Sequence, residues 1–284
     1  MDGNAFLFLP EEMIGLKNVL FIGAGSMAEA IIAGITSSGA VKPASVFVMN
    51  KSDQARLDEL RDKYGITPVK SGDPEISQAE LAVFATKPKD ARQAMEQVAK
   101  QLEPSAAVLS VMAGIPISLF EKILGSRPVA RSMPNTSATI GLAATGVAMN
   151  EAVCDNVREN ILSLLGSVGL VKEVEEDELH LITALAGSGP AYVYYFAEAL
   201  EEAATTSGLC GTDARDLIIQ VLEGAAAMLK RRTAEPSELR EHVTSPGGTT
   251  AAGIRALDDA GFHNAVASCI RAAENRSREL ATGQ

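Results

Sequence analysis

The first half of the chain alternates short apolar runs with amphipathic stretches. Apolar runs of strand length, rich in branched and aromatic residues, occur at 19–22, 46–49, 81–85, 107–111 and 128–132. Between them, the spacing of apolar positions predicts helices over 27–38, 53–64, 89–101 and 116–124. Strands that alternate with helices indicate right-handed crossovers and a parallel sheet covered on both faces, which is an α/β fold.

The pattern changes after Asn135. The sequence predicts a more exposed strand in 141–150, then a helix over 151–165 and a strand near 170–174. The rest of the chain carries no strand signal, and its apolar spacing predicts helices over 176–186, 190–207, 213–230, 236–242, 250–260 and 262–280. We therefore expect an α/β domain over 1–174, with an N-terminal extension over 1–16, followed by an all-helical domain over 175–284.

Composition adds an expectation about assembly. The chain has 284 residues and 46% hydrophobic residues, enough for a buried core in about two domains. The helical half is too short to bury all its apolar faces, and the small residues from Gly224 to Ala227 allow helices to approach closely. A homodimer built through this half is the favoured interpretation, and a self-contained helical bundle is the alternative.

The net charge and the cysteine and histidine positions exclude several classes of function. A formal charge of −11 disfavours nucleic acid and anionic membrane surfaces as partners. No segment is long enough to span a bilayer, the N-terminus is not typical of a signal peptide, and we expect a cytoplasmic protein. Cys154, Cys210 and Cys269 lie far apart, so we expect them to pack as reduced apolar side chains, and the histidines form no metal-ligand pattern. We predict no metal site.

A glycine-rich motif lies between the first strand and the first helix. Gly23, Gly25 and Ala28 give the spacing G-x-G-x-x-A. The first glycine allows a tight turn, the second lets a pyrophosphate approach the backbone, and the small third residue lets the helix pack on its strand. This is typical of a Rossmann-type, doubly wound dinucleotide-binding sheet. The predicted cofactor contacts here are Ile22, Gly23, Ala24, Gly25, Ser26 and Met27.

The end of the second strand bears on the choice of cofactor. NAD-specific domains usually place an acidic residue there, but this chain has Asn50, Lys51 and Ser52. A cation and two hydrogen-bond donors suit a 2′-phosphate, so NADPH is favoured and NADH is the alternative. A plainer interpretation is that Ser52 or Asp53 caps the next helix and Lys51 is solvated.

Two further strand ends add candidates for the same cleft. They are Ala85, Thr86, Lys87 and Pro88 after the third apolar run, and Met112 and Ala113 after the fourth. Small residues there would leave room for ribose and nicotinamide. They are also compatible with ordinary strand-to-helix turns.

The segment "SPGGTT", residues 245–250, precedes a predicted helix. It is compatible with an ordinary helix start capped by Thr249 or Thr250. It also offers a carboxylate the backbone N–H groups of 247–250, a positive helix end and up to three hydroxyls. We expect a small anion to bind here.

These segments together resemble the pyrroline-5-carboxylate reductase family. The resemblance rests on "FIGAGSMAEAI", "ATKPKD", "MPNTSATIGLAATG", "ALAGSGPAYVYYFAEAL" and "VTSPGGTTAAGIRALD", and it runs from about Lys17 to the C-terminal helix. It implies a cytoplasmic oxidoreductase of proline biosynthesis that reduces Δ1-pyrroline-5-carboxylate to L-proline with NAD(P)H. It also implies a dimer formed through the helical domains, in some members assembled further into a ring, and raises feedback inhibition by proline as a question.

The resemblance implies roles for particular residues. Thr250 would hydrogen-bond the ring nitrogen of the substrate, while Ser245 and the N–H groups of Thr249 and Thr250 would hold its carboxylate. Gly247 and Gly248 would let the loop approach the substrate closely. The segment 133–136 would border the nicotinamide.

Two other functions are weighed against this one. A β-hydroxyacid dehydrogenase also joins a Rossmann domain to helices, but it relies on a lysine that the helix predicted over 190–207 lacks. A non-catalytic NADPH-binding regulator would have no use for a carboxylate clamp in 245–250. Both are therefore disfavoured.

Overall fold

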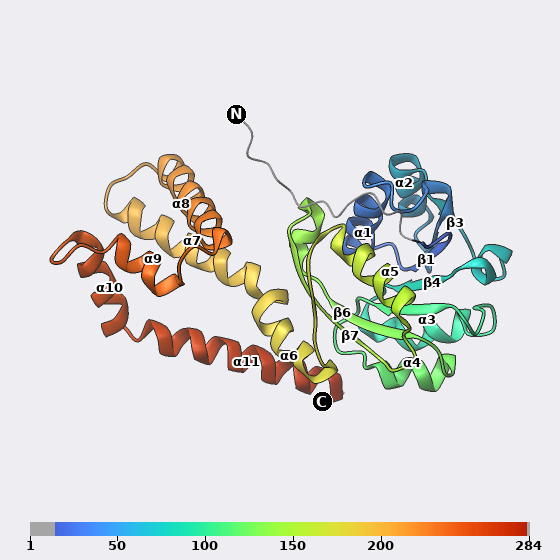
Figure 1. Ribbon diagram of the computed structural model, residues 1–284. Helices are drawn as coiled ribbons and strands as arrows, with labels where there is room; N and C mark the ends of the chain where they lie inside the picture. The colour runs from blue at the N-terminus through green and yellow to red at the C-terminus, as the bar shows by residue number, and fades with distance from the viewer. Residues whose placement is uncertain (1–14, 283–284) are drawn as a thin grey trace. The chain divides into compact units, whose positions relative to one another are not determined.

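The computed structural model describes residues 15–282, which form two compact units (Figure 1). The first unit runs to Gly187 and also includes the end of the chain from Glu274. The second unit is Ser188–Ala273. The apolar segment "FLFLP" of the expected N-terminal extension lies outside the described residues.

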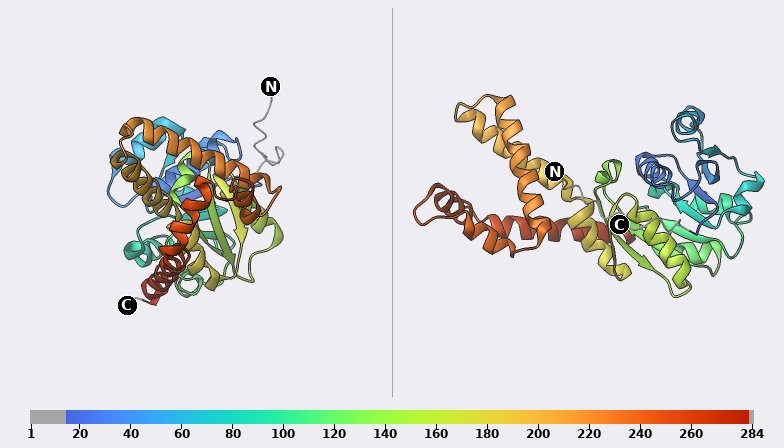
Figure 2. Two further views of the ribbon diagram at one scale, coloured as in Figure 1. Left: turned by 90° about the vertical axis from the view of Figure 1, so that its left-hand side faces the viewer. Right: turned by 45° about the horizontal axis from the view of Figure 1, so that its top comes forward.

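A sheet forms the centre of the first unit (Figures 1 and 2). It has eight strands in the order β3-β2-β1-β4-β5-β6-β7-β8. The strands are β1 (Val19–Ile22), β2 (Val46–Met49), β3 (Thr67–Pro68), β4 (Leu81–Phe84), β5 (Ala107–Ser110), β6 (Val129–Met133), β7 (Ala143–Met149) and β8 (Gly169–Glu173). β1 lies between β2 and β4 and pairs in parallel with both. The chain therefore adds β2 and β3 on one side of β1 and then adds β4 and the later strands on the other side. All the predicted strands are confirmed, and the two-residue β3 was not predicted.

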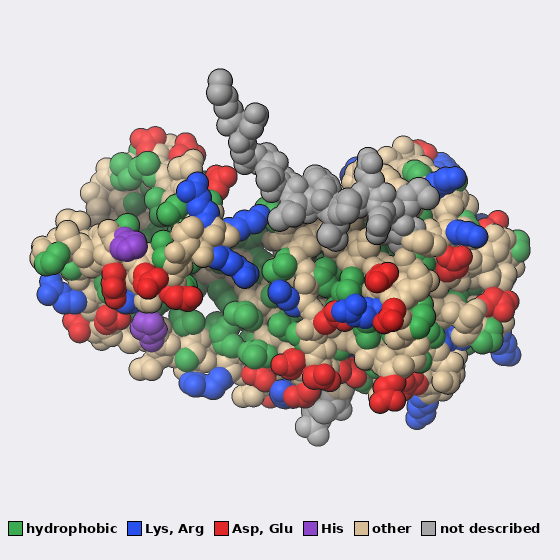
Figure 3. Space-filling view, in the orientation of Figure 1, with side chains coloured by type: hydrophobic (Ala, Val, Ile, Leu, Met, Phe, Trp, Pro, Cys, Tyr) green, Lys and Arg blue, Asp and Glu red, His purple; other side chains and the backbone are tan. Residues whose placement is uncertain are grey.

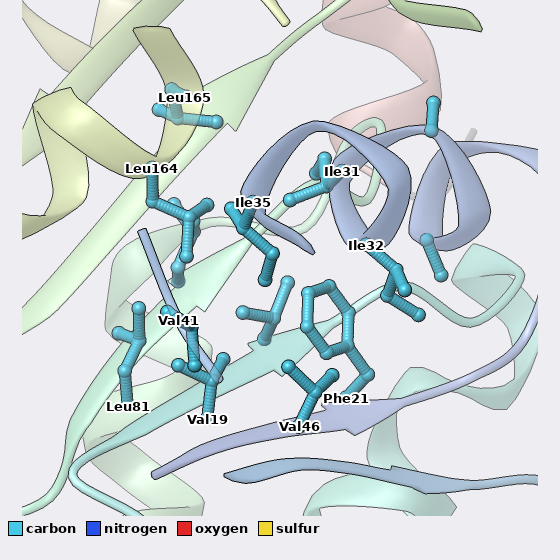
Figure 4. Close-up of a cluster of buried hydrophobic side chains, with 14 of the residues drawn as sticks. Val19, Phe21, Ile31, Ile32, Ile35, Val41, Val46, Leu81, Leu164 and Leu165 are labelled. Carbon is cyan, nitrogen blue, oxygen red and sulfur yellow. The ribbon is translucent and has the colours of Figure 1, made fainter. Parts of the chain in front are cut away.

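Helices cover both faces of the sheet, as expected for a doubly wound fold. One face is covered by α1 (Ser26–Ser37), α2 (Gln54–Tyr64) and α5 (Asp155–Gly166), and the other by α3 (Ala91–Val98) and α4 (Ile117–Leu124). Figure 4 shows Ile31, Ile32 and Ile35 of α1 above Val19 and Phe21 of β1. Because side chains alternate along a strand, Leu20 and Ile22 point to the opposite core.

The expectation that β7 is a more exposed strand is wrong, and its direction was not predicted. Its pairing with β6 is antiparallel, because the connection contains only the short 3₁₀ turn η4 (Thr136–Ile140) and cannot form the longer crossover that a parallel pair needs. β7 is also largely buried rather than exposed, since Ala143 and Val147 belong to the core and α6 covers Gly146. A Cβ added at Gly146 would lie 2.9 Å from the Ile182 side chain, so α6 (Leu179–Ile182) packs directly on β7.

The first unit extends beyond β8. The expected helix over 176–186 is divided into the 3₁₀ turn η5 (Glu176–Glu178), α6 and a π-helical turn, η6 (Thr183–Gly187). The end of α11 (Phe262–Thr282) packs against this segment: His180 Nδ1 lies 2.9 Å from Ser277 Oγ, and Arg278 Nη1 donates to Asp177 at 2.5 Å. The compact unit therefore ends at Gly187, further along the chain than the expected boundary at Val174.

The second unit contains no strand among its residues, all of which the structure describes. Its helices are α7 (Gly189–Thr206), α8 (Gly211–Arg231), α9 (Pro236–His242), α10 (Thr249–Asp259) and the first part of α11. Large apolar side chains remain on its surface, among them Tyr194, Tyr195 and Val221 with exposed fractions of 65%, 74% and 65%. Figure 3 shows hydrophobic side chains at the surface among the polar ones. This unit therefore leaves apolar faces uncovered, as the sequence predicts.

Other features of the described residues bear on the classes of function considered above. All three cysteines are exposed in this chain, so the expectation that they pack as apolar side chains is wrong. Within residues 15–282, no helix is both long enough and apolar enough to cross a membrane. The same residues contain no group of three or more His, Cys, Asp or Glu side chains placed to hold a metal ion.

Candidate active site

The glycine-rich turn between β1 and α1 is fixed by a close backbone contact. Gly23 has φ +112°, and a Cβ at this position would lie 2.6 Å from the carbonyl oxygen of Ala85. The Gly23 N–H donates to Met49 O at 2.9 Å, which ties the turn to the end of β2. Ala28 is fully buried, so α1 lies close against the sheet. Only glycine fits the first position of the motif.

The second glycine is different. Gly25 is the N-cap of α1, with extended backbone (φ −76°, ψ −180°) and no side-chain cap, and no neighbouring atom of residues 15–282 lies within 4 Å of the position a Cβ would take. An uncapped helix N-terminus beside open space is a ready site for a phosphate. The turn therefore fits a dinucleotide pyrophosphate.

The structure brings the four predicted cofactor segments together at one edge of the sheet. They follow β1, β2, β4 and β5, which are neighbouring parallel strands whose carboxyl ends share that edge. Thr86 Oγ1 donates to Met112 Sδ at 3.1 Å, and Ala85 N donates to Ile22 O at 2.9 Å. Ligands of doubly wound sheets bind at this edge, where the strand order reverses.

Lys51 has an acidic as well as a polar neighbour. Its Nζ donates to Gln93 Oε1 at 2.9 Å and lies 3.6 Å from Asp90, yet the side chain is 64% exposed. Asp53 caps α2 by accepting from Arg56 N at 2.9 Å, so the capping interpretation holds for Asp53. Lys51 and Ser52 are exposed and Asn50 is half-buried, which is compatible with the predicted 2′-phosphate contact.

Arg56 is a residue of this site that the sequence analysis missed. Its Nε donates to Ala24 O at 3.0 Å, between the two glycines of the turn, and its guanidinium pairs with Glu29 and Glu59. No sequence motif marks this contact, because it forms only when α2 folds against α1. Hydrogen bonds from Lys63 and Arg56 lower the pKa of Glu29 to about 2.

The end of β6 contacts the π-helical turn η6. Asn135 Nδ2 donates to Ala186 O at 3.0 Å, and a Cβ at Gly187 would lie 3.2 Å from Met133 Cε. The segment expected to border the nicotinamide is therefore held by backbone and side-chain contacts. π-Helical turns are rare and occur frequently at functional sites.

The loop 245–250 belongs to the second unit. The N-cap of α10 is Gly248, with no side-chain cap, so the interpretation that Thr249 or Thr250 caps the helix is wrong. Gly247 has φ +71°, and Gly248 N donates to Ser245 O at 3.0 Å, which closes a tight turn. A Cβ at Gly248 would lie 2.4 Å from Ser245 Oγ, so this hydroxyl lies directly beside the uncapped helix end. The N–H groups of α10 are free of side-chain caps, as an anion site requires.

Two cavities of the first unit lie elsewhere. One, of about 470 Å³, is lined by Leu81 and Ala107, the first residues of β4 and β5, and is therefore at the opposite sheet edge from the glycine-rich turn. The other, of about 990 Å³, is lined by acidic residues such as Glu151 and Glu173. Neither is lined by a predicted cofactor residue, and we assign neither to the reaction.

Two family models match the chain. The first, described as pyrroline-5-carboxylate reductase dimerisation, covers residues 176–280. The second, described as NADP oxidoreductase coenzyme F420-dependent, covers residues 18–114. The second match contains all the predicted cofactor residues, and the first contains the whole second unit.

Known proteins match over nearly the whole length. Pyrroline-5-carboxylate reductase 2 of Bacillus subtilis is 40% identical over 93% of this chain and 95% of its own. A solved pyrroline-5-carboxylate reductase from Coxiella burnetii superimposes with a TM-score of 0.88 at 35% identity, covering 93% of this chain and 98% of that one. A pyrroline carboxylate reductase from Plasmodium falciparum, solved with NADP bound, has a TM-score of 0.83 at 26% identity, covering 95% and 99%.

The site and the matches indicate the same family. The matched relatives are pyrroline-5-carboxylate reductases, and the glycine-rich turn and the uncapped helix after "SPGGTT" are the features that the sequence resemblance rests on. The chain is an NAD(P)-dependent oxidoreductase with a dimerisation domain, and it belongs to the pyrroline-5-carboxylate reductase family.

Proposed function

We propose that this chain reduces the C=N bond of Δ1-pyrroline-5-carboxylate with NADPH and releases L-proline, the last step of proline biosynthesis. The observation that carries the proposal is the uncapped N-terminus of α10, with Ser245 Oγ beside it, in a chain that also has an uncapped glycine-rich turn. Such a helix end attracts a carboxylate despite the acidic net charge.

The substrate carboxylate is assigned to the loop 245–250. Ser245 Oγ and the N–H groups of Thr249 and Thr250 donate to its oxygens, while Gly247 and Gly248 keep the backbone within reach. Thr250 Oγ1 accepts a hydrogen bond from the protonated ring nitrogen and so orients the C=N carbon. No side chain in the loop titrates near neutral pH, so the proton on nitrogen comes from solvent before binding.

The first unit is assigned the cofactor. The N–H groups at Gly25 and Ser26 hold its pyrophosphate, and the segments at Ala85–Pro88 and at Met112 and Ala113 border its ribose and nicotinamide. The nicotinamide supplies the hydride when bound. The protein's part is to hold two flat molecules face to face.

Substitution of Thr250 by alanine tests the assigned role. The variant Thr250→Ala should lose most of kcat/KM for the imine, because the ring nitrogen loses its orienting acceptor, while the Kd for NADPH stays unchanged. Thr244→Ala is a matched control, since Thr244 Oγ1 donates to Arg240 O and is outside the loop. Normal turnover by Thr250→Ala would rule the role out.

We propose that NADPH is preferred over NADH, because Asn50, Lys51 and Ser52 offer donors and a cation where a carboxylate would repel a 2′-phosphate. The variant Lys51→Ala should raise KM for NADPH more than KM for NADH. NADH is an internal control, since it lacks the 2′-phosphate. Equal effects on both cofactors would contradict the contact.

We also propose that the protein works in the cytoplasm and that its dimers associate into a larger ring. The exposed apolar side chains of α7 and α8, such as Tyr195 and Val221, support burial against another copy.

A further inference from the structure

Arg56 makes a contact with the backbone of the glycine-rich turn. It is in the first turn of α2, and its Nε donates to the carbonyl oxygen of Ala24 at 3.0 Å. Ala24 stands between Gly23 and Gly25, so Arg56 holds the middle peptide of the motif. The glycine-rich turn follows β1, whereas α2 follows β2. The helix after β2 therefore restrains the turn after the neighbouring strand β1.

The guanidinium is itself held on its other two nitrogens. Nη1 donates to Glu59 at 2.7 Å, and Nη2 pairs with Glu29 of α1. Glu29 in turn accepts from Lys63 Nζ at 2.9 Å and Tyr64 OH at 2.8 Å. The Arg56 and Glu29 side chains are only 21% and 22% exposed, so this pair is more restrained than an ordinary surface ion pair.

Peptide geometry gives this contact a consequence for phosphate binding. In a trans peptide the carbonyl of Ala24 and the N–H of Gly25 point in opposite directions. A hydrogen bond that fixes the carbonyl toward Arg56 therefore fixes the Gly25 N–H toward the other side of the turn. No atom of the described chain occupies the space next to Gly25.

We propose that Arg56, held by Glu29, is a positioning residue that aims the Gly25 N–H at the pyrophosphate of the cofactor. The proposal rests on the assignment of the glycine-rich turn as the cofactor site. NADPH and NADH share the pyrophosphate, so the clamp on Ala24 aids both equally. It sets cofactor affinity and takes no part in choosing between the two.

A direct contact between Arg56 and the 2′-phosphate is the competing role. Three of the five guanidinium N–H groups already have acceptors in the chain, so only the second hydrogens of Nη1 and Nη2 could reach a 2′-phosphate. The two roles differ in a measurable way, because a 2′-phosphate contact affects NADPH alone.

The test uses the full-length enzyme and fluorescence titration of NADPH and NADH. Arg56→Lys keeps the charge but loses the fork that reaches Ala24 O, so the Kd for both cofactors should rise by the same factor, roughly tenfold. At saturating cofactor, kcat and KM for the imine should be unchanged. Glu29→Gln should raise the Kd by a smaller factor than Arg56→Lys, and by the same factor for NADPH and NADH. Arg61→Lys is the matched control, since Arg61 lies on the same helix and pairs with Asp58 and Asp62, and it should leave both Kd values unchanged.

Each alternative result contradicts the proposal. Unchanged Kd values in Arg56→Lys would overturn it, and a loss confined to NADPH would assign Arg56 to the 2′-phosphate instead. If Arg56→Lys does not fold, Glu29→Gln decides alone, and unchanged Kd values in that variant overturn the proposal. Failure of the unsubstituted enzyme to bind either cofactor would refute the cofactor site itself, which is a separate outcome.

Discussion

Substitution by alanine should have different effects at the two glycines of the turn. At Gly25 it should weaken cofactor binding, and at Gly23 it should lower the free energy of unfolding. At Gly25 the backbone is extended and nothing in the described part of the chain lies within 4 Å of a Cβ, so Gly25→Ala meets no obstacle among those residues. Alanine reduces the entropy of the unfolded chain but is a poorer N-cap than glycine. These effects oppose each other, and the free energy of unfolding should change by less than about 0.5 kcal/mol.

The same methyl group should weaken cofactor binding, because it occupies the space through which the pyrophosphate approaches the backbone. Loss of one hydrogen bond to a charged phosphate costs about 1.5–3 kcal/mol, which is roughly a ten- to hundredfold rise in the Kd for NADPH. The measurement is fluorescence titration of NADPH, with urea unfolding on the same protein.

Gly23→Ala is the contrasting variant. Its φ of +112° disfavours alanine, and the new Cβ would lie 2.6 Å from Ala85 O, which is backbone and cannot rotate away. We expect a loss of at least about 2 kcal/mol in the free energy of unfolding. If Gly25→Ala binds NADPH as tightly as the unsubstituted protein, the assignment of this turn to the pyrophosphate is refuted.

Two further predictions concern acid stability and assembly. The pKa of Glu29 is lowered from 4.5 to about 2 by its hydrogen bonds to Lys63 and Arg56, so its contribution to stability is present above pH 4.5 and lost as the pH falls toward 2. Urea unfolding of Glu29→Gln should therefore show a weaker pH dependence in this range, and an identical slope would contradict the coupling. Val221→Asp places a charge on an exposed apolar face of α8 and should lower the oligomer mass seen by sedimentation, whereas an unchanged mass would exclude this face as an interface.

The sequence predicted those elements whose signal is local. The strands β1, β2, β4 and β5 are short, fully buried apolar runs, and they appear where the pattern placed them. The strand β3 has only two residues and presents no run at all. The π-helical turn η6 was missed because its apolar spacing resembles that of an α-helix over so short a length.

Features that depend on distant contacts were beyond sequence reasoning. The direction of β7 follows from the length of a connection, and the extent of the first unit follows from contacts such as that of His180 with Ser277. The contact of Arg56 with Ala24 joins α2 to the turn before α1, 32 residues earlier in the chain, and has no motif. Gly23, by contrast, was predictable because a tight turn with φ +112° excludes other residues.

The central claim is that the chain is a reductase of a cyclic imine carboxylate. The most direct test is to mix the full-length protein, NADPH and Δ1-pyrroline-5-carboxylate, to follow the loss of reduced-nicotinamide absorbance, and to identify the product. We expect rapid turnover with one proline formed for each NADPH oxidised. Tight binding of NADPH with no oxidation in the presence of the imine would contradict it, and would leave the first unit as a nucleotide-binding domain with another function.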